Sequence, residues 1–88
     1  MFAFVSPHRN FRDDDDREWS AWDVIPRRRG VRIALTPRLA HGWLAFESND
    51  ERRRLAPIPA EWHLMPEERL RALWRDAEAL PPRRRLLE

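Results

Sequence analysis

The sequence predicts a small α+β fold: three to four antiparallel strands in one sheet, covered by one C-terminal helix, with an extended N-terminal arm. Two observations predict it. Segments in which polar and apolar residues alternate, as in half-buried strands, fill the middle of the chain, and one segment with a helical apolar period follows them. The 88 residues suffice for one domain at most. We therefore expect an arm at residues 1–18, a domain at 19–80 and a basic C-terminal tail at 81–88.

Four short segments are predicted as strands, at residues 19–25, 31–36, 42–48 and 52–58. Alternate side chains of a strand face opposite sides. Leu44 and Phe46 therefore share one face of the third strand. By the same rule Trp19 and Trp22, three residues apart, lie on opposite faces of the first strand, so at least one of the two indoles is exposed if that strand is continuous.

The ends of the third strand carry turn signals. Gly42 follows a predicted turn at residues 36–41 and is expected at positive φ, which glycine adopts without steric cost. Asn49 and Asp50 fit a hairpin turn into the fourth strand. That strand runs into two prolines, which cannot donate to a strand ladder, so it is either an edge strand or leaves the sheet as an extended segment.

A helix is predicted over residues 66–80. Pro66 suits the first helical position, and the Pro81-Pro82 pair ends the helix. Its apolar residues recur every three or four positions and form one stripe, which must be buried against the sheet. The stripe and the alternating strand residues together predict a core of Val31, Ile33, Leu35, Leu44, Phe46, Leu55, Leu70, Leu73, Trp74 and Ala77.

Charge is unevenly distributed along the chain. All 17 basic residues are arginine, against 15 acidic residues, which gives a net charge of +2. Residues 1–26 carry three arginines and six acids, whereas residues 27–88 carry 14 arginines and nine acids. This polarised pattern differs from the uniformly basic field that is typical of nucleic-acid-binding proteins.

No motif in the chain predicts catalysis or a bound cofactor. The absence of cysteine excludes disulfides and thiol chemistry. His8, His41 and His63 have no metal-ligand spacing, and with two glycines the chain has no phosphate-binding loop. The acidic run at 13–16 lacks the alternating ligands of a calcium loop. We interpret it as a solvated loop or, alternatively, as a contact for an arginine patch on a partner. We expect no enzyme, no metal and no cofactor.

Aromatic and arginine residues are more numerous than so small a core can bury, and both types are preferred anchors of protein interfaces. The predicted partner-binding residues are Phe2, Phe4, Phe11, Trp19, Trp22, Arg27, Arg28, Arg29, Trp43, Arg52, Arg53, Arg54, Arg83, Arg84 and Arg85. Trp62 is a further candidate for contact. The apolar residues of the arm indicate either a frayed tail or an aromatic anchor. A nucleic-acid-binding or regulatory protein is the alternative function, because arginine and aromatic side chains also bind single strands.

No apolar run approaches the ~20 residues that span a bilayer, and the first residues lack the basic stretch and apolar length of a signal peptide. We expect a cytoplasmic protein, peripheral on the cytoplasmic face of a membrane, where arginine-rich segments are favoured. Protein subunits of a larger complex are the expected partners, with contact to lipid head groups as a second contribution.

Residues 42–62 resemble a group of small bacterial proteins that share a GWL-x-FES strand followed by RRL-x-P-x-P-x-x-W. The matching residues here include Gly42, Trp43, Leu44, Phe46, Pro57, Pro59 and Trp62. This resemblance implies a shared fold and no chemistry. In size, in lack of a spanning helix and in basic-aromatic character, the chain is also similar to membrane-extrinsic polypeptides that brace a double-ring photosynthetic reaction centre–light-harvesting complex. That similarity implies a non-enzymatic scaffold subunit of such an assembly.

Overall fold

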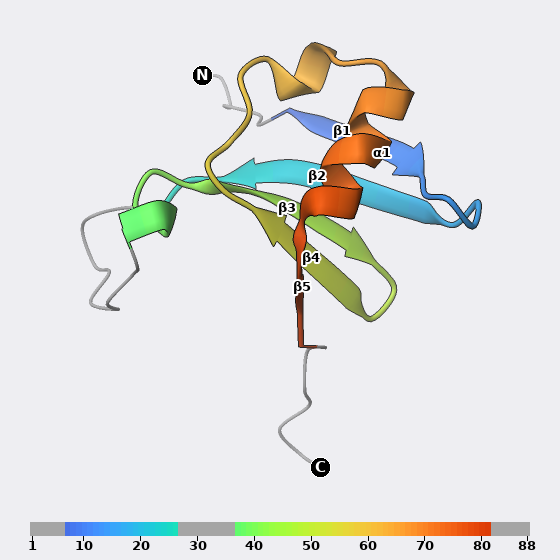
Figure 1. Cartoon of the computed structure of the whole chain (residues 1–88), viewed down its shortest axis with the longest axis horizontal. Coiled ribbons are helices and arrows are strands. Elements are labelled where there is room, and N and C mark those ends of the chain that lie inside the picture. The colour runs from blue at the N-terminus through green and yellow to red at the C-terminus, as the bar shows by residue number, and fades with distance from the viewer. Residues whose placement is uncertain (1–6, 27–36, 82–88) are drawn as a thin grey trace, which may run out of the picture.

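The computed structural model describes residues 7–26 and 37–81 and has an α+β fold, as predicted (Figure 1). Five antiparallel strands form one sheet, and one α-helix lies between the fourth and fifth strands along the chain. The elements are β1 (His8–Arg12), β2 (Glu18–Val24), β3 (Trp43–Ser48), β4 (Glu51–Leu55), α1 (Glu67–Asp76) and β5 (Glu78–Leu80), with short 3₁₀ helices at Pro37–Leu39 and Trp62–Leu64.

The strands follow one another across the sheet in the order β1-β2-β3-β4-β5, each antiparallel to its neighbours. The register pairs Ala21 with Phe46 and Leu44 with Leu55. Since the side chains of paired residues share a face, Trp19, Ala21, Leu44 and Phe46 all lie on one side of the sheet. We call this side the core face.

The hydrophobic core lies between the core face and α1. Leu70 and Trp74 of the helix belong to the same buried cluster as the residues of β2 and β3. The Trp19 and Trp74 rings meet edge to face with their centroids 5.5 Å apart, a favoured aromatic geometry. The buried cluster consists of Phe11, Trp19, Ala21, Leu44, Phe46, Trp62, Leu70, Trp74 and Ala77, with Leu55, Ile58, Met65 and Leu73 packed against it.

The C-terminal end of the fold differs from the prediction. The helix begins at Glu67, one residue after the predicted start, with Pro66 as its extended N-cap. It ends at Asp76, because Ala77 is extended and the next three residues form β5 beside β4. The helix is therefore not the last element, and Leu80 lies on a strand and not on the helical stripe. β4 is not an edge strand either; it ends at Leu55, and the proline-containing segment leaves the sheet there.

The N-terminal region also differs from the prediction. His8–Arg12, expected within an extended arm, forms β1 and pairs with β2, so the sheet begins well before residue 19. The predicted strand at 31–36, with its three core residues, lies outside the described residues. Gly42 has the predicted positive φ, at 105°. A Cβ atom there would lie 2.7 Å from the carbonyl oxygen of Val24, so the position also requires glycine sterically.

Candidate protein-binding face

Several residues predicted to bind a partner serve the fold instead. Phe11 and Trp19 are only 2% and 1% exposed, so in this fold their side chains form part of the core and are not presented to a partner. The reason is strand alternation, which points both side chains from β1 and β2 onto the core face. Trp62, also a candidate for contact, is 2% exposed in the same core.

The acidic run begins with a buried residue that organises the β1–β2 loop. The Asp13 carboxylate accepts hydrogen bonds from the backbone N–H groups of Asp15 (2.8 Å) and Arg17 (2.9 Å) and from the indole N–H of Trp19 (2.8 Å). Burial raises the pKa of this carboxyl, but the three hydrogen bonds and the Arg17 charge outweigh it and hold the pKa below the ordinary value of 3.8. Asp13 is thus a structural acceptor.

The neighbouring acid fastens the loop to the helix. Arg75 of α1 donates two hydrogen bonds to Asp14, from Nε at 2.9 Å and from Nη2 at 2.8 Å. Hydrogen bonding by Arg75 lowers the pKa of Asp14 and correspondingly raises the pKa of Arg75. Arg17 reaches from the same loop to Glu51 at 2.8 Å. The acidic run therefore meets arginines of its own chain.

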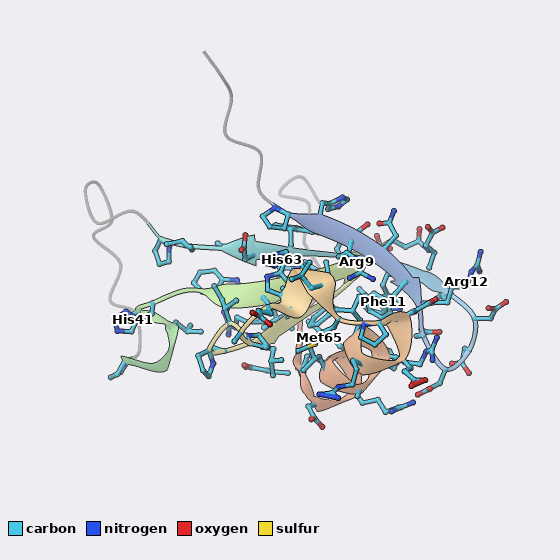
Figure 2. The ribbon with its side chains drawn as sticks, turned by 90° about the horizontal axis from the view of Figure 1, so that it is seen from above. Arg9, Phe11, Arg12, His41, His63 and Met65 are labelled. Carbon is cyan, nitrogen blue, oxygen red and sulfur yellow. The ribbon has the colours of Figure 1, made fainter. Side chains whose placement is uncertain are left out.

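The segment around the second 3₁₀ helix is bonded to a side chain of β1. Arg9 Nη1 donates to the carbonyl oxygens of His63 (2.9 Å) and Met65 (2.8 Å), and Figure 2 shows these residues side by side. The backbone N–H of Arg12 donates to the Glu67 carboxylate at 2.9 Å, and its carbonyl accepts from Arg71 at 2.8 Å. The end of this strand edge is already occupied by groups of the helix.

Of the arginine triplet on β4, the middle residue points into the fold. The guanidinium carbon of Arg53 lies 4.1 Å from the centroid of the Trp74 ring and 5.9 Å from that of Trp19. Its Nη1 also donates to the carbonyl oxygen of Trp74 at 2.9 Å. Arg53 therefore links β4 to α1, although it was predicted as a partner-binding residue. Arg52 and Arg54 point to the opposite side of the sheet.

That opposite side, which we call the open face, is the candidate functional site. It carries the remaining tryptophans of the sheet, Trp22 of β2 and Trp43 of β3, both half-buried. The register places His8, Trp22, Ala45, Arg54 and Glu78 in one row across all five strands. The next row on one side contains Ser20, Glu47, Arg52 and Leu80, and Val24 pairs with Trp43 on the other side.

A hollow of about 210 Å³ lies on this face, lined by Trp22, Trp43 and Leu80 among others. Ala45 stands in the middle of the row, and its small side chain leaves the space between the larger neighbours. Each tryptophan has a partner on its outer side: the His8 ring centroid is 6.0 Å from that of Trp22, and the Arg54 guanidinium carbon is 5.9 Å from the centroid of the Trp43 ring.

Both arginines that β4 places on the open face have partners within the chain. Arg54 Nη2 lies 3.5 Å from a Glu78 carboxylate oxygen, and Arg52 Nη2 donates to the carbonyl oxygen of Pro81 at 3.2 Å. Residues 7–26 and 37–81 together contain 10 arginines and 14 acidic residues, so the formal charges in these two ranges sum to −4. The positive balance of the chain therefore comes from the stretches outside them, which include the predicted Arg27–Arg29 and Arg83–Arg85 sites. Phe2 and Phe4 lie outside the described residues as well.

The histidines lie at separate places. His8 is on the open face, and Figure 2 shows His41 at one end of the molecule, away from His63, which lies near the middle beside Arg9. Within residues 7–26 and 37–81, no three His, Asp or Glu side chains are placed to hold a metal ion. In the same residues, no helix is long and apolar enough to cross a membrane.

Comparison of the chain with protein-family models, curated proteins and solved structures finds no match. The side chains of the open face are therefore the basis on which a function can be inferred. Sequence reasoning selected Trp22, Trp43, Arg52 and Arg54 but missed the hollow and its apolar lining from Val24, Ala45 and Leu80. The alternation of β2 and β3 could have revealed the first two. Leu80 could not be found, because its segment has a helical period.

Proposed function

We propose that this protein is a non-enzymatic scaffold subunit that binds another protein through its open face. The observation that supports the proposal is the placement of Trp22 and Trp43 on the side of the sheet opposite α1, beside a hollow and outside the core that the other three tryptophans fill. Tryptophan is one of the residue types in which interface hot spots are enriched.

The engagement of the open-face arginines favours a protein partner over a nucleic acid. Arginine and tryptophan on a sheet also suit stacking with single-stranded bases. Here, however, Arg54 is paired with Glu78 and Arg52 bonds to a backbone carbonyl, so both guanidiniums are already engaged within the chain. Membership of a photosynthetic reaction centre–antenna assembly, attachment to a membrane and cytoplasmic location remain predictions of the sequence.

The test compares the proteins that co-purify with full-length chain variants from cells of its source. We expect the double variant Trp22→Ala/Trp43→Ala to lose the partners that accompany the wild type in fixed ratio. Leu64→Ala is the matched control, because Leu64 is 70% exposed and lies outside the open face. Retention of the same partners by the double variant would contradict the proposal. Salt-sensitive retention of single-stranded DNA or RNA by both variants would favour the nucleic-acid alternative.

Substitutions are the better test than truncation. Deleting residues 1–12 to remove the predicted arm would also delete β1 and take Phe11 out of the core. Loss of binding would then report loss of folding.

A further inference from the structure

The segment that leads into α1 presents an apolar side chain to solvent. The 3₁₀ helix Trp62–Leu64 has about three residues per turn, so its three side chains point in different directions. Trp62 is buried in the core, whereas Leu64 is 70% exposed, the highest value among the large apolar residues that the structure describes. Arg9 shares the core face with Ala21 and donates to two carbonyls of this segment, which therefore lies on the α1 side of the sheet.

A hollow of about 400 Å³ opens beside this leucine. Its lining comes from the 3₁₀ helix, the residues before it and the first turn of α1: Ala60, Glu61, Leu64, Met65, Pro66 and Arg69. Glu61 has a left-handed backbone with φ at 54°, which is uncommon for glutamate. Such conformations persist where the surrounding structure determines them, and they are concentrated at functional sites. The hollow is therefore a second candidate surface for contact.

The two charged residues of this hollow have opposite signs and are unpaired. Within residues 7–26 and 37–81, neither the Glu61 carboxylate nor the Arg69 guanidinium has a hydrogen bond or an ion pair, with each other or with a third group. Nearby charges of α1 differ in this respect. The Glu67 carboxylate accepts a hydrogen bond from the backbone of Arg12 and lies 3.5 Å from the Arg71 guanidinium. The hollow thus offers one free acid and one free base beside an exposed leucine.

A second copy of the chain would pair both charges at once. In a twofold-symmetric dimer the same patch of each subunit meets itself, so a contact between two different residues occurs twice. Glu61 of each copy would meet Arg69 of the other copy, with Leu64 beside its counterpart. A partner patch of one sign would instead attract one of these charges and repel the other. We propose that this protein forms a twofold dimer through the hollow at Glu61, Leu64 and Arg69.

This dimer goes beyond the proposed function and uses a different surface. The hollow lies on the α1 side of the sheet, so it does not include Trp22 or Trp43 of the open face. A dimer would present two open faces, and two linked binding sites increase the avidity for an assembly with repeated subunits. Because the patch is small, the association should be weak.

The test measures the association state of the full-length protein by sedimentation at concentrations from about 10 μM to about 1 mM, the range in which small interfaces dissociate. We expect the wild type to pass from monomer to dimer within it. Glu61→Arg places arginine opposite arginine, and Arg69→Glu places glutamate opposite glutamate, so each should raise the dissociation constant about tenfold or more. Circular dichroism checks that both variants are folded.

Asp15→Arg is the matched control, because it changes the charge as Glu61→Arg does. Asp15 is exposed in the β1–β2 loop, which Asp14 joins to Arg75 in the last turn of α1, whereas Arg69 belongs to the first turns. The control should dimerise as the wild type does. Equal losses from Asp15→Arg and Glu61→Arg would overturn the proposal, because net charge alone would then explain them.

Mixing the two single variants tests the pairing itself. Glu61→Arg has two basic residues at the hollow and Arg69→Glu has two acidic ones, so an equimolar mixture should form a heterodimer although neither variant associates alone. The double variant Glu61→Arg/Arg69→Glu should dimerise as well, because both contacts again join opposite charges. A mixture that stays monomeric would show that Glu61 and Arg69 do not pair. Wild type that stays monomeric throughout, or association unchanged by either substitution, would overturn the dimer.

Leu64→Ala separates this surface from the open face. It removes apolar contact between the copies, so it should weaken the dimer about tenfold, but it should retain the proteins that co-purify through the open face. Trp22→Ala/Trp43→Ala should have the reverse effects. If the tryptophan variant loses the dimer and Leu64→Ala does not, the copies meet through the open face and the present assignment is wrong.

Discussion

The two faces of the sheet use the same residue types for different purposes. On the core face, Trp19 is 1% exposed, its indole N–H is bonded to Asp13, and Arg53 approaches the Trp74 ring to 4.1 Å. On the open face, Trp22 is half-buried, and the Arg54 guanidinium carbon lies 5.9 Å from the centroid of the Trp43 ring. Residues that stabilise the fold have close contacts and hydrogen-bonded donors. The tryptophans of the open face have more distant contacts, which leaves part of their surface available to a partner.

The largest contrast is expected between the two tryptophans of β2. Trp19→Ala removes the centre of the core and leaves the Asp13 carboxylate without its indole donor, so the free energy of unfolding should fall by about 3–5 kcal/mol. A domain this small has little stability to lose. Trp22→Ala should cost about 1 kcal/mol. Urea denaturation followed by circular dichroism measures both, and equal losses would show that the open face is also part of the core.

Arg53 and Arg54 of β4 allow the two faces to be compared for charged side chains, because Arg53 lies on the core face and Arg54 on the open face. Arg53→Met keeps apolar bulk but loses the contact with the Trp74 ring and the hydrogen bond to its carbonyl, so unfolding should become easier by about 2–3 kcal/mol. Arg54→Met loses a partly exposed ion pair and should change stability by about 1 kcal/mol or less. The same denaturation assay applies, and a reversed order of the two effects would contradict the assignment of Arg53 to the fold.

The alternation of residues in the sequence predicted which side chains of the central strands share a face. Period-two alternation is a strong local signal, and it correctly placed Leu44 and Phe46 in the core and Trp19 and Trp22 on opposite faces. It did not predict which face α1 packs on, because that depends on contacts between residues distant in sequence. Trp19 was therefore expected at an interface.

The C-terminal strand was missed for a related reason. Residues 77–80 continue the apolar period of the helix, and local propensity cannot weigh a helix extension against hydrogen bonds to a strand more than twenty residues earlier. The hollow of the open face depends on Leu80 from that strand. Part of the candidate site was thus unpredictable from local pattern, whereas its tryptophans were not.

The Asp13 carboxylate makes the stability of the fold depend on pH. Its pKa is lower in the folded protein than the ordinary 3.8, so its ionised form stabilises the fold above that value, and this contribution is lost as the pH falls through the folded pKa. Asp13→Asn should lower stability at pH 7 by about 1–2 kcal/mol, because the amide cannot accept all three hydrogen bonds. Below pH 4 the wild type should lose stability more steeply than the variant.

Urea denaturation at pH 7, 5, 4 and 3 measures this difference. Asp15→Asn is the matched control, since Asp15 is an exposed carboxylate of the same loop. The control should behave as the wild type does throughout the range. Parallel acid limbs for the wild type and Asp13→Asn would contradict the proposed role of the buried carboxylate.

The smallest effect on stability is expected for the partly exposed ion pair between Arg75 and Asp14. Arg75 donates two hydrogen bonds to Asp14, but both side chains are about half exposed, so solvent and salt screen the pair. Arg75→Gln should raise the pKa of Asp14 towards its ordinary value, as measured by NMR titration of the side-chain carboxyl, with little change in stability. In 1 M salt the difference in pKa should shrink. A loss of stability comparable to that of Asp13→Asn would show that exposed and buried anchors of this loop matter equally.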